Sequence, residues 1–147
     1  MKVQGEQSLP LGQQAAWELL LDTAVLARAM PGCESLDPVG PDEYQMKMQV
    51  GVAAMQGLFA GKIRIEDKNP PSSYRLVVEG TGKIGFVRGG GRLELAPQPG
   101  GTLVRYAGEV QVGGLIASVG ERMLDMTTKM MIRRFFEALA REAEGTT

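Results

Sequence analysis

Between residues 44 and 112, apolar and polar side chains alternate in short runs, and this pattern constrains the fold more than any other feature. Within each run the apolar residues are two or four positions apart and so fall on one side of a strand. The runs are Tyr44, Met46, Met48, Val50 and Val52; Phe59, Ile63 and Ile65; Tyr74, Leu76 and Val78; Leu93 and Leu95; and Val104, Tyr106, Val110 and Val112. A period of two predicts half-buried strands. Turn signals at residues 69–73 and 97–101 separate the runs and indicate an antiparallel meander.

Helical patterns flank the predicted strands. A first strand ends at Pro10, and a helix beginning at Gln13 is followed by a second short helix that Asp22 or Thr23 caps. Pro31-Gly32 ends that helix. A long helix is expected from about Leu115 to Glu142, which would span about 40 Å. This order predicts one α+β domain over residues 1–147, in which a curved antiparallel sheet wraps around the long helix.

Glycines are concentrated in two adjacent strands of the predicted meander, at positions 80, 82, 85, 89, 90 and 91. Glycine inside a strand often marks a bulge or a sharp bend. Two interpretations stay open, a strongly curved sheet and a close approach of a ligand to the backbone. The run Gly89-Gly90-Gly91 lacks the sequence context of a phosphate-binding loop.

Composition excludes several classes of chemistry. The 147 residues contain no histidine and a single cysteine, Cys33, so serine–histidine catalysis, histidine zinc sites and internal disulfides are excluded. A net charge of −1 gives no electrostatic footprint for nucleic acid. No signal peptide or run of about 18 apolar residues is present, which predicts a cytoplasmic protein. We expect no metal, no cofactor and no catalytic residue, and we interpret Cys33 as a turn residue.

Methionine is the most informative candidate for a binding site, because its flexible side chain adapts to irregular apolar space. On the long helix, Val119, Met123, Met126 and Met130 form one stripe, and Leu124, Met131, Phe135 and Leu139 form a second beside it. The residues expected to line a cavity between sheet and helix are Tyr44, Met46, Met48, Phe59, Tyr106, Val119, Met123, Met126 and Met130. An ordinary packed core is the competing interpretation of the same pattern. Lys129, Arg133, Glu137 and Arg141 mark the solvated side of the helix.

Several short motifs resemble one known family across nearly the whole chain. The segment Met30-Pro31-Gly32-Cys33-Glu34-Ser35-Leu36 resembles the Pro-Gly-Cys signature of the carbon monoxide dehydrogenase G-subunit family. Gly61-Lys62-Ile63, Pro70-Pro71-Ser72-Ser73-Tyr74, Gly113-Gly114-Leu115 and Phe135-Phe136-Glu137 follow in the same order. The resemblance implies the START-like, polyketide-cyclase-like helix-grip fold.

The resemblance also implies an accessory role beside a molybdenum-containing dehydrogenase of the carbon monoxide dehydrogenase type. That role is to carry a lipophilic ligand such as a quinone, to recruit the enzyme to the membrane, or both. Longer members have a proline-rich linker and an apolar tail, whereas this sequence stops at Glu144-Gly145-Thr146-Thr147. We therefore expect at most peripheral contact with the inner face of the membrane.

Three hypotheses of function remain open. The chain is a carrier of an apolar small molecule or lipid, an enzyme of the cyclase or hydratase kind, or a docking protein with a collapsed cavity. The enzyme would need an acid or base in the cavity, and Glu79 and Glu109 are the strand carboxylates to consider. The oligomeric state also stays open, a homodimer included.

Overall fold

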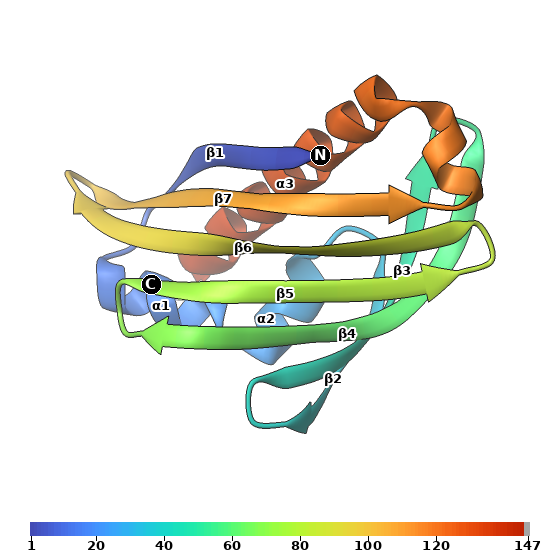
Figure 1. Cartoon of the computed structure of the whole chain (residues 1–147). Coiled ribbons are helices and arrows are strands. Elements are labelled where there is room, and N and C mark those ends of the chain that lie inside the picture. Colours follow the sequence, from blue (N-terminus) through green and yellow to red (C-terminus); the bar gives the residue numbers. More distant parts are fainter. Residues whose placement is uncertain (146–147) are drawn as a thin grey trace.

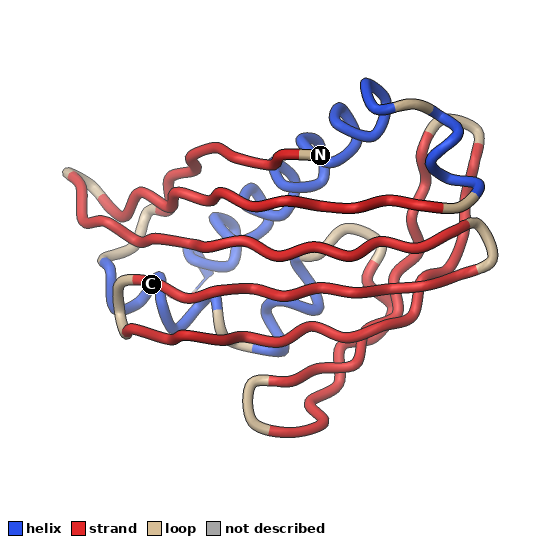
Figure 2. The backbone as a smooth tube through the Cα atoms, viewed as in Figure 1, coloured by secondary structure: helices blue, strands red, loops and turns tan. Residues whose placement is uncertain are grey.

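The computed structural model describes residues 1–145, and the last two residues of the expected domain, Thr146 and Thr147, lie outside that range. Within it, seven strands form one antiparallel sheet in the order β1-β7-β6-β5-β4-β3-β2. All the helices lie on one side of this sheet (Figures 1 and 2). The elements are β1 (Lys2–Leu9), α1 (Gln13–Leu20), α2 (Thr23–Ala29), β2 (Cys33–Gly40), β3 (Glu43–Val52), β4 (Met55–Asn69), β5 (Ser73–Gly82), β6 (Gly85–Gln98), β7 (Gly101–Gly113), the 3₁₀ helix η1 (Leu115–Val119) and α3 (Glu121–Gly145). The α+β helix-grip prediction is confirmed.

The meander from β3 to β7 follows the alternation in the sequence, and β1 pairs with β7 at the far edge. The edge strand β2 was not predicted. Its sequence shows no sustained alternation of apolar and polar residues. In the structure only Leu36 of β2 is buried, and residues 37–40 are all exposed. Pro38 cannot donate a ladder hydrogen bond, so the strand is tolerated at the edge, where one side is unpaired.

Both short helices begin where predicted, and α2 ends before Pro31-Gly32 as predicted. The Asp22 carboxylate accepts hydrogen bonds from the backbone N–H groups of Ala24 and Val25, at 3.0 and 3.2 Å, and so caps α2. Gly32 ends the turn after α2 with φ +75°, a conformation that favours glycine. Its carbonyl accepts from the Gln49 N–H at 2.8 Å, which ties this turn to β3.

The single long helix predicted from Leu115 is wrong at its start. The chain forms η1 over Leu115–Val119, breaks at Gly120 with φ +94°, and only then begins α3. A residue with φ +94° and ψ 155° cannot continue a right-handed helix, so Val119 lies outside α3 and not in a stripe with its methionines.

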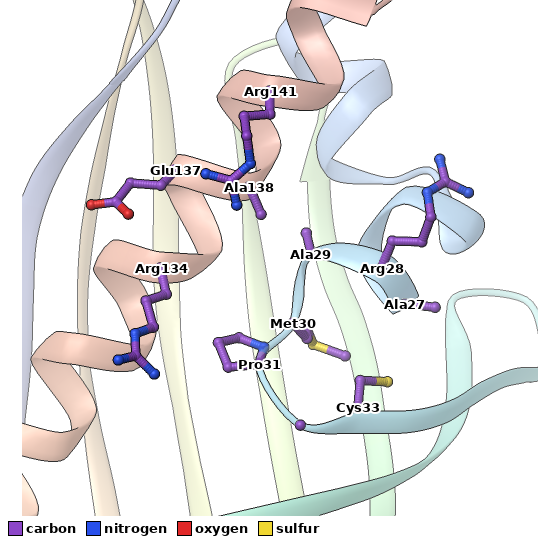
Figure 3. Close-up of a pocket in the computed structure, with 11 residues that line it drawn as sticks. Ala27, Arg28, Ala29, Met30, Pro31, Cys33, Arg134, Glu137, Ala138 and Arg141 are labelled. Carbon is purple, nitrogen blue, oxygen red and sulfur yellow. The ribbon is translucent and has the colours of Figure 1, made fainter.

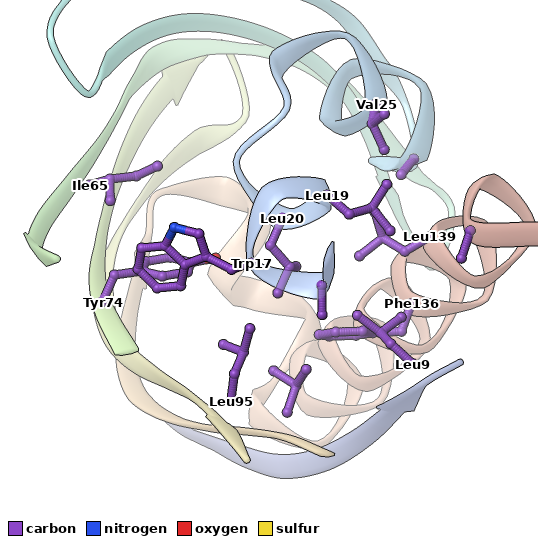
Figure 4. Close-up of a cluster of buried hydrophobic side chains, with 14 residues drawn as sticks. Leu9, Trp17, Leu19, Leu20, Val25, Ile65, Tyr74, Leu95, Phe136 and Leu139 are labelled. Atoms are coloured by element: carbon purple, nitrogen blue, oxygen red, sulfur yellow. The ribbon is translucent and has the colours of Figure 1, made fainter. Parts of the chain in front are cut away.

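Buried side chains gather in two separate clusters at opposite ends of the concave face. The first joins α1, α2 and the C-terminal half of α3 to the sheet, with Trp17, Tyr74, Phe136 and Leu139 among its members (Figure 4). The second, at the β3–β4 and β5–β6 turns, is built on Val52, Phe59 and Ile116. Figure 4 also shows the sheet curling around the first cluster. The middle of the concave face therefore lies between two cores and belongs to neither.

Candidate functional site

A band of apolar side chains occupies the concave face between the two buried clusters. Its members share the parity of the buried strand residues, or lie on α3, and none belongs to either cluster; they are Val3, Met46, Met48, Ile63, Val78, Val110, Met130 and Met131. All of them except Met46 are only partly buried. Apolar residues on the inner face of a sheet are normally packed away from water. This set is called the concave band below, and apart from Met46 it is apolar surface that solvent still reaches.

Glycines interrupt the concave band on β6 and β7. Gly91 pairs with Gly108, and Gly89 pairs with Val110. A side chain on Gly108 would collide with the carbonyl oxygen of Gly90. A Cβ on Gly91 would lie only 2.8 Å from the carbonyl oxygen of Ala107. Close approach of the neighbouring backbones thus explains these glycines, which supports the curved-sheet interpretation.

The same glycines leave part of the inner face without side chains. The backbone of α3 runs nearest to β1 and α2, rather than to β6 or β7. The helix does not come close to the glycine positions to fill the place of the missing side chains. Apart from Met46, the side chains of the concave band are therefore only partly buried.

The residues predicted to line a cavity are divided among these regions. Phe59 is buried in the second cluster, and Val119 packs against that cluster from η1. Tyr44 and Tyr106 are half-buried against the first cluster. Met46, Met48 and Met130 belong to neither cluster and are assigned to the concave band.

Two of the predicted methionines are exposed. Met123 is 37% exposed and Met126 is 60% exposed, so the expectation that both side chains face inward is corrected. The buried residues of α3 are Phe136, Leu139 and Ala143, all in its C-terminal half. The N-terminal half of α3 therefore packs loosely, and Met126 lies at the surface.

The tyrosines differ in their surroundings. Tyr106 stacks on Phe136 with ring centroids 6.2 Å apart, and its phenol lies across Gly5, where a side chain would collide with it. Tyr74 is the most buried, 4% exposed, and meets Trp17 edge-on at 5.6 Å. Burial raises the pKa of Tyr74 well above that of a free phenol, so this hydroxyl stays protonated at neutral pH.

The strand carboxylates considered for catalysis do not face the concave band, whereas Cys33 pairs with Met48 at its edge. Glu79 and Glu109 are exposed on the parity opposite to that of the buried strand residues. Cys33 starts β2, where its Sγ donates to the Ser35 carbonyl oxygen at 3.5 Å. Partial burial raises the pKa of this thiol, which lowers its reactivity at neutral pH.

Two further properties hold for residues 1–145. In that range, no group of three or more histidine, cysteine, aspartate or glutamate side chains is arranged to hold a metal ion. Nor does any helix there have the length and apolar character needed to cross a membrane.

A cleft of about 540 Å³ opens between α3 and the end of α2 (Figure 3). Residues 27–33, which include the Pro31-Gly32-Cys33 turn, form one wall. The other wall consists of Arg134, Glu137, Ala138 and Arg141 of α3. Sequence reasoning missed this cleft, because it assigned Glu137 and Arg141 only to the solvated side of the helix.

Comparison with known proteins identifies relatives of the whole chain. A family model for the carbon monoxide dehydrogenase G subunit (CoxG) matches residues 5–144. The crystal structure of a conserved protein from Geobacillus kaustophilus is 33% identical, with a TM-score of 0.95, and the match covers 99% of this chain and 97% of that chain. No curated protein is a significant match.

More distant solved structures share the fold alone. The Zhui aromatase/cyclase from Streptomyces sp. R1128 is 15% identical over 98% of this chain and 93% of that chain, with a TM-score of 0.68. A protein from Thermus thermophilus is 14% identical over 97% of this chain and 99% of that chain, with a TM-score of 0.67. The family model spans nearly all of the sequence and shows that the chain belongs to the CoxG family, named for the G subunit of carbon monoxide dehydrogenase.

Proposed function

We propose that this chain acts as one helix-grip domain over residues 1–147 and serves as a non-catalytic accessory protein of a molybdenum-containing dehydrogenase of the carbon monoxide dehydrogenase type. In this proposal, it binds a lipophilic ligand such as a quinone on the concave band, between the sheet and α3. Recruitment of the enzyme to the inner face of the membrane is the second part of the role. Family membership supports the accessory assignment.

The observation that carries the proposal is the solvent-accessible apolar surface of the concave band. Burying apolar surface stabilises a fold by about 25 cal/mol per Å². A chain whose only task was to fold would gain stability by burying this surface. An apolar ligand lying between the sheet and α3 would cover the same surface and gain the same free energy. Met48, Met130 and Met131 would adapt to its shape.

The enzyme alternative has less support from the arrangement of charged groups. A cyclase or hydratase needs an acid or base that reaches the bound substrate. Glu79 and Glu109, the strand carboxylates considered for this role, are exposed on the opposite parity. A purely docking protein with a collapsed interior would be expected to bury its concave face, whereas Val78 and Val110 are only partly buried.

Organic extraction of the purified protein, followed by mass spectrometry, tests whether a ligand is present. Titration with a short-chain quinone analogue then tests where it binds. We expect Met130→Lys to weaken binding by at least about tenfold, because the charge would lie against the apolar ligand. Leu58→Lys is the matched control, since Leu58 is 44% exposed on the outer parity of β4.

Two results would contradict the proposal. One is the absence of any extracted apolar molecule together with no binding of the analogue at micromolar concentration. The other is an equal loss of affinity for the analogue in Met130→Lys and Leu58→Lys, which would show that the analogue does not bind specifically at the concave band.

A further inference from the structure

The cleft between α2 and α3 carries basic charge that the chain itself does not neutralise. Arg134 and Arg141 both come from α3 and border the cleft, opposite Pro31 (Figure 3). Within residues 1–145, neither guanidinium group makes a hydrogen bond or an ion pair. The whole chain, by contrast, has a net charge of −1.

The nearby carboxylates are engaged elsewhere. Glu142 accepts two hydrogen bonds from Arg28, at 2.8 and 3.0 Å, and these hold the pKa of Glu142 below its usual value. Glu137 is 3.8 Å from the Nε of Arg133, which does not line the cleft. Figure 3 shows the Glu137 and Arg28 side chains directed away from the space in front of Pro31. The acids on α3 closest to the two arginines are therefore already paired.

The walls of the cleft leave room for an incoming group. Arg134 and Arg141 are seven residues apart, so their backbone positions are about 10.5 Å apart along the helix. Ala138 lies between them, and the facing wall offers Ala27, Ala29 and Gly32. Small side chains on both walls keep the space in front of the guanidinium groups open, and no acid from residues 27–33 lines it.

We propose that this cleft binds an oxyanion, a carboxylate or a phosphate, through Arg134 and Arg141. The planar guanidinium group presents a fork of N–H donors that matches both of these oxyanions. The site is separate from the concave band, and it would stand if no apolar ligand were found. The Pro31-Gly32-Cys33 turn then has a second role besides ending α2, since it forms the wall that faces the arginines.

Titration with inorganic phosphate and with citrate, followed by two-dimensional NMR at low ionic strength, tests the proposal. Amide resonances of residues 27–33 and 134–141 should shift in a saturable way. Arg134→Ala with Arg141→Ala should weaken binding by about tenfold for each arginine removed. Arg122→Ala is the control, because Arg122 lies on α3 outside the cleft and forms no ion pair within residues 1–145.

Two further experiments distinguish guanidinium recognition from charge alone, and a lipid phosphate from a free anion. Arg134→Lys with Arg141→Lys keeps the charge but not the fork, and intermediate affinity is expected. Vesicles containing phosphatidylglycerol, compared with phosphatidylcholine vesicles, show whether a lipid phosphate is the source of the oxyanion. The same resonances should respond to the anionic vesicles if it is.

The proposal is overturned if neither the free anions nor the anionic vesicles produce saturable shifts at these residues. It is also overturned if Arg122→Ala weakens binding by the same factor per charge removed as the double alanine variant, since the response would then follow net charge. Both alanine variants should unfold at the same temperature as the parent within a few degrees, because the replaced side chains are exposed.

Discussion

Replacing Met46 by lysine tests the assignment of inner and outer methionines. Met46 is 6% exposed on β3, next to Leu36 on β2 and Gly61 on β4. Its terminal methyl group lies 3.2 Å from the point where a Cβ on Gly80 would stand, so the side chain extends across the sheet. Lysine has nearly the same length, and the main change is therefore a positive charge in an apolar place.

The expected cost follows from the loss of hydration. An uncompensated buried charge destabilises a protein by about 3–5 kcal/mol. That is a large part of a typical stability of about 5–15 kcal/mol. Met126→Lys introduces the same charge at a side chain that is 60% exposed, and it should change the free energy of unfolding by about 0.5 kcal/mol or less.

Urea unfolding at pH 7 and pH 10 measures both variants. With a slope of about 2 kcal/mol per molar urea, the Met46→Lys midpoint should fall by about 1.5–2.5 M at pH 7. Burial lowers the pKa of a lysine in the folded state, so the penalty is fully present at low pH and is lost as pH rises toward the unfolded value of about 10.4. Equal midpoints for the two variants at pH 7, or a Met46→Lys penalty that does not shrink at pH 10, would refute the reasoning.

Three further substitutions test other parts of the structure. Cys33→Ser should change stability by about 1 kcal/mol or less and leave binding of the quinone analogue intact; loss of binding at unchanged stability would revive a chemical role for the thiol. Gly32→Ala should cost at least about 2 kcal/mol in urea unfolding, because φ is +75° and the new Cβ would collide with the Gln49 carbonyl oxygen. Leu139→Ala should cost about 2–5 kcal/mol, since Leu139 is 0% exposed in the first cluster, and a cost below about 1 kcal/mol would contradict that packing.

The strands from β3 to β7 and the caps of α2 could be predicted because their signals are local. Alternation with a period of two decides which side of a strand faces inward, and Asp22 caps α2 through hydrogen bonds within three residues. The edge strand β2 carries no such alternation, and it forms because β3 offers it a partner. The break at Gly120 could not be predicted, since a lone glycine in a helical pattern does not show which conformation it adopts.

The sequence by itself determined the helix-grip fold class and an apolar inner face, because both follow from periodicity along the chain. Only the tertiary structure decided which side of α3 is buried. Two apolar stripes lie side by side on that helix, and packing in the first cluster buried Phe136 and Leu139 while leaving Met126 exposed. The tertiary structure also decided which charged groups at the α2–α3 cleft are paired and which are not. Arg28 reaches Glu142 across 114 positions of sequence, and such a pairing depends on distance in space.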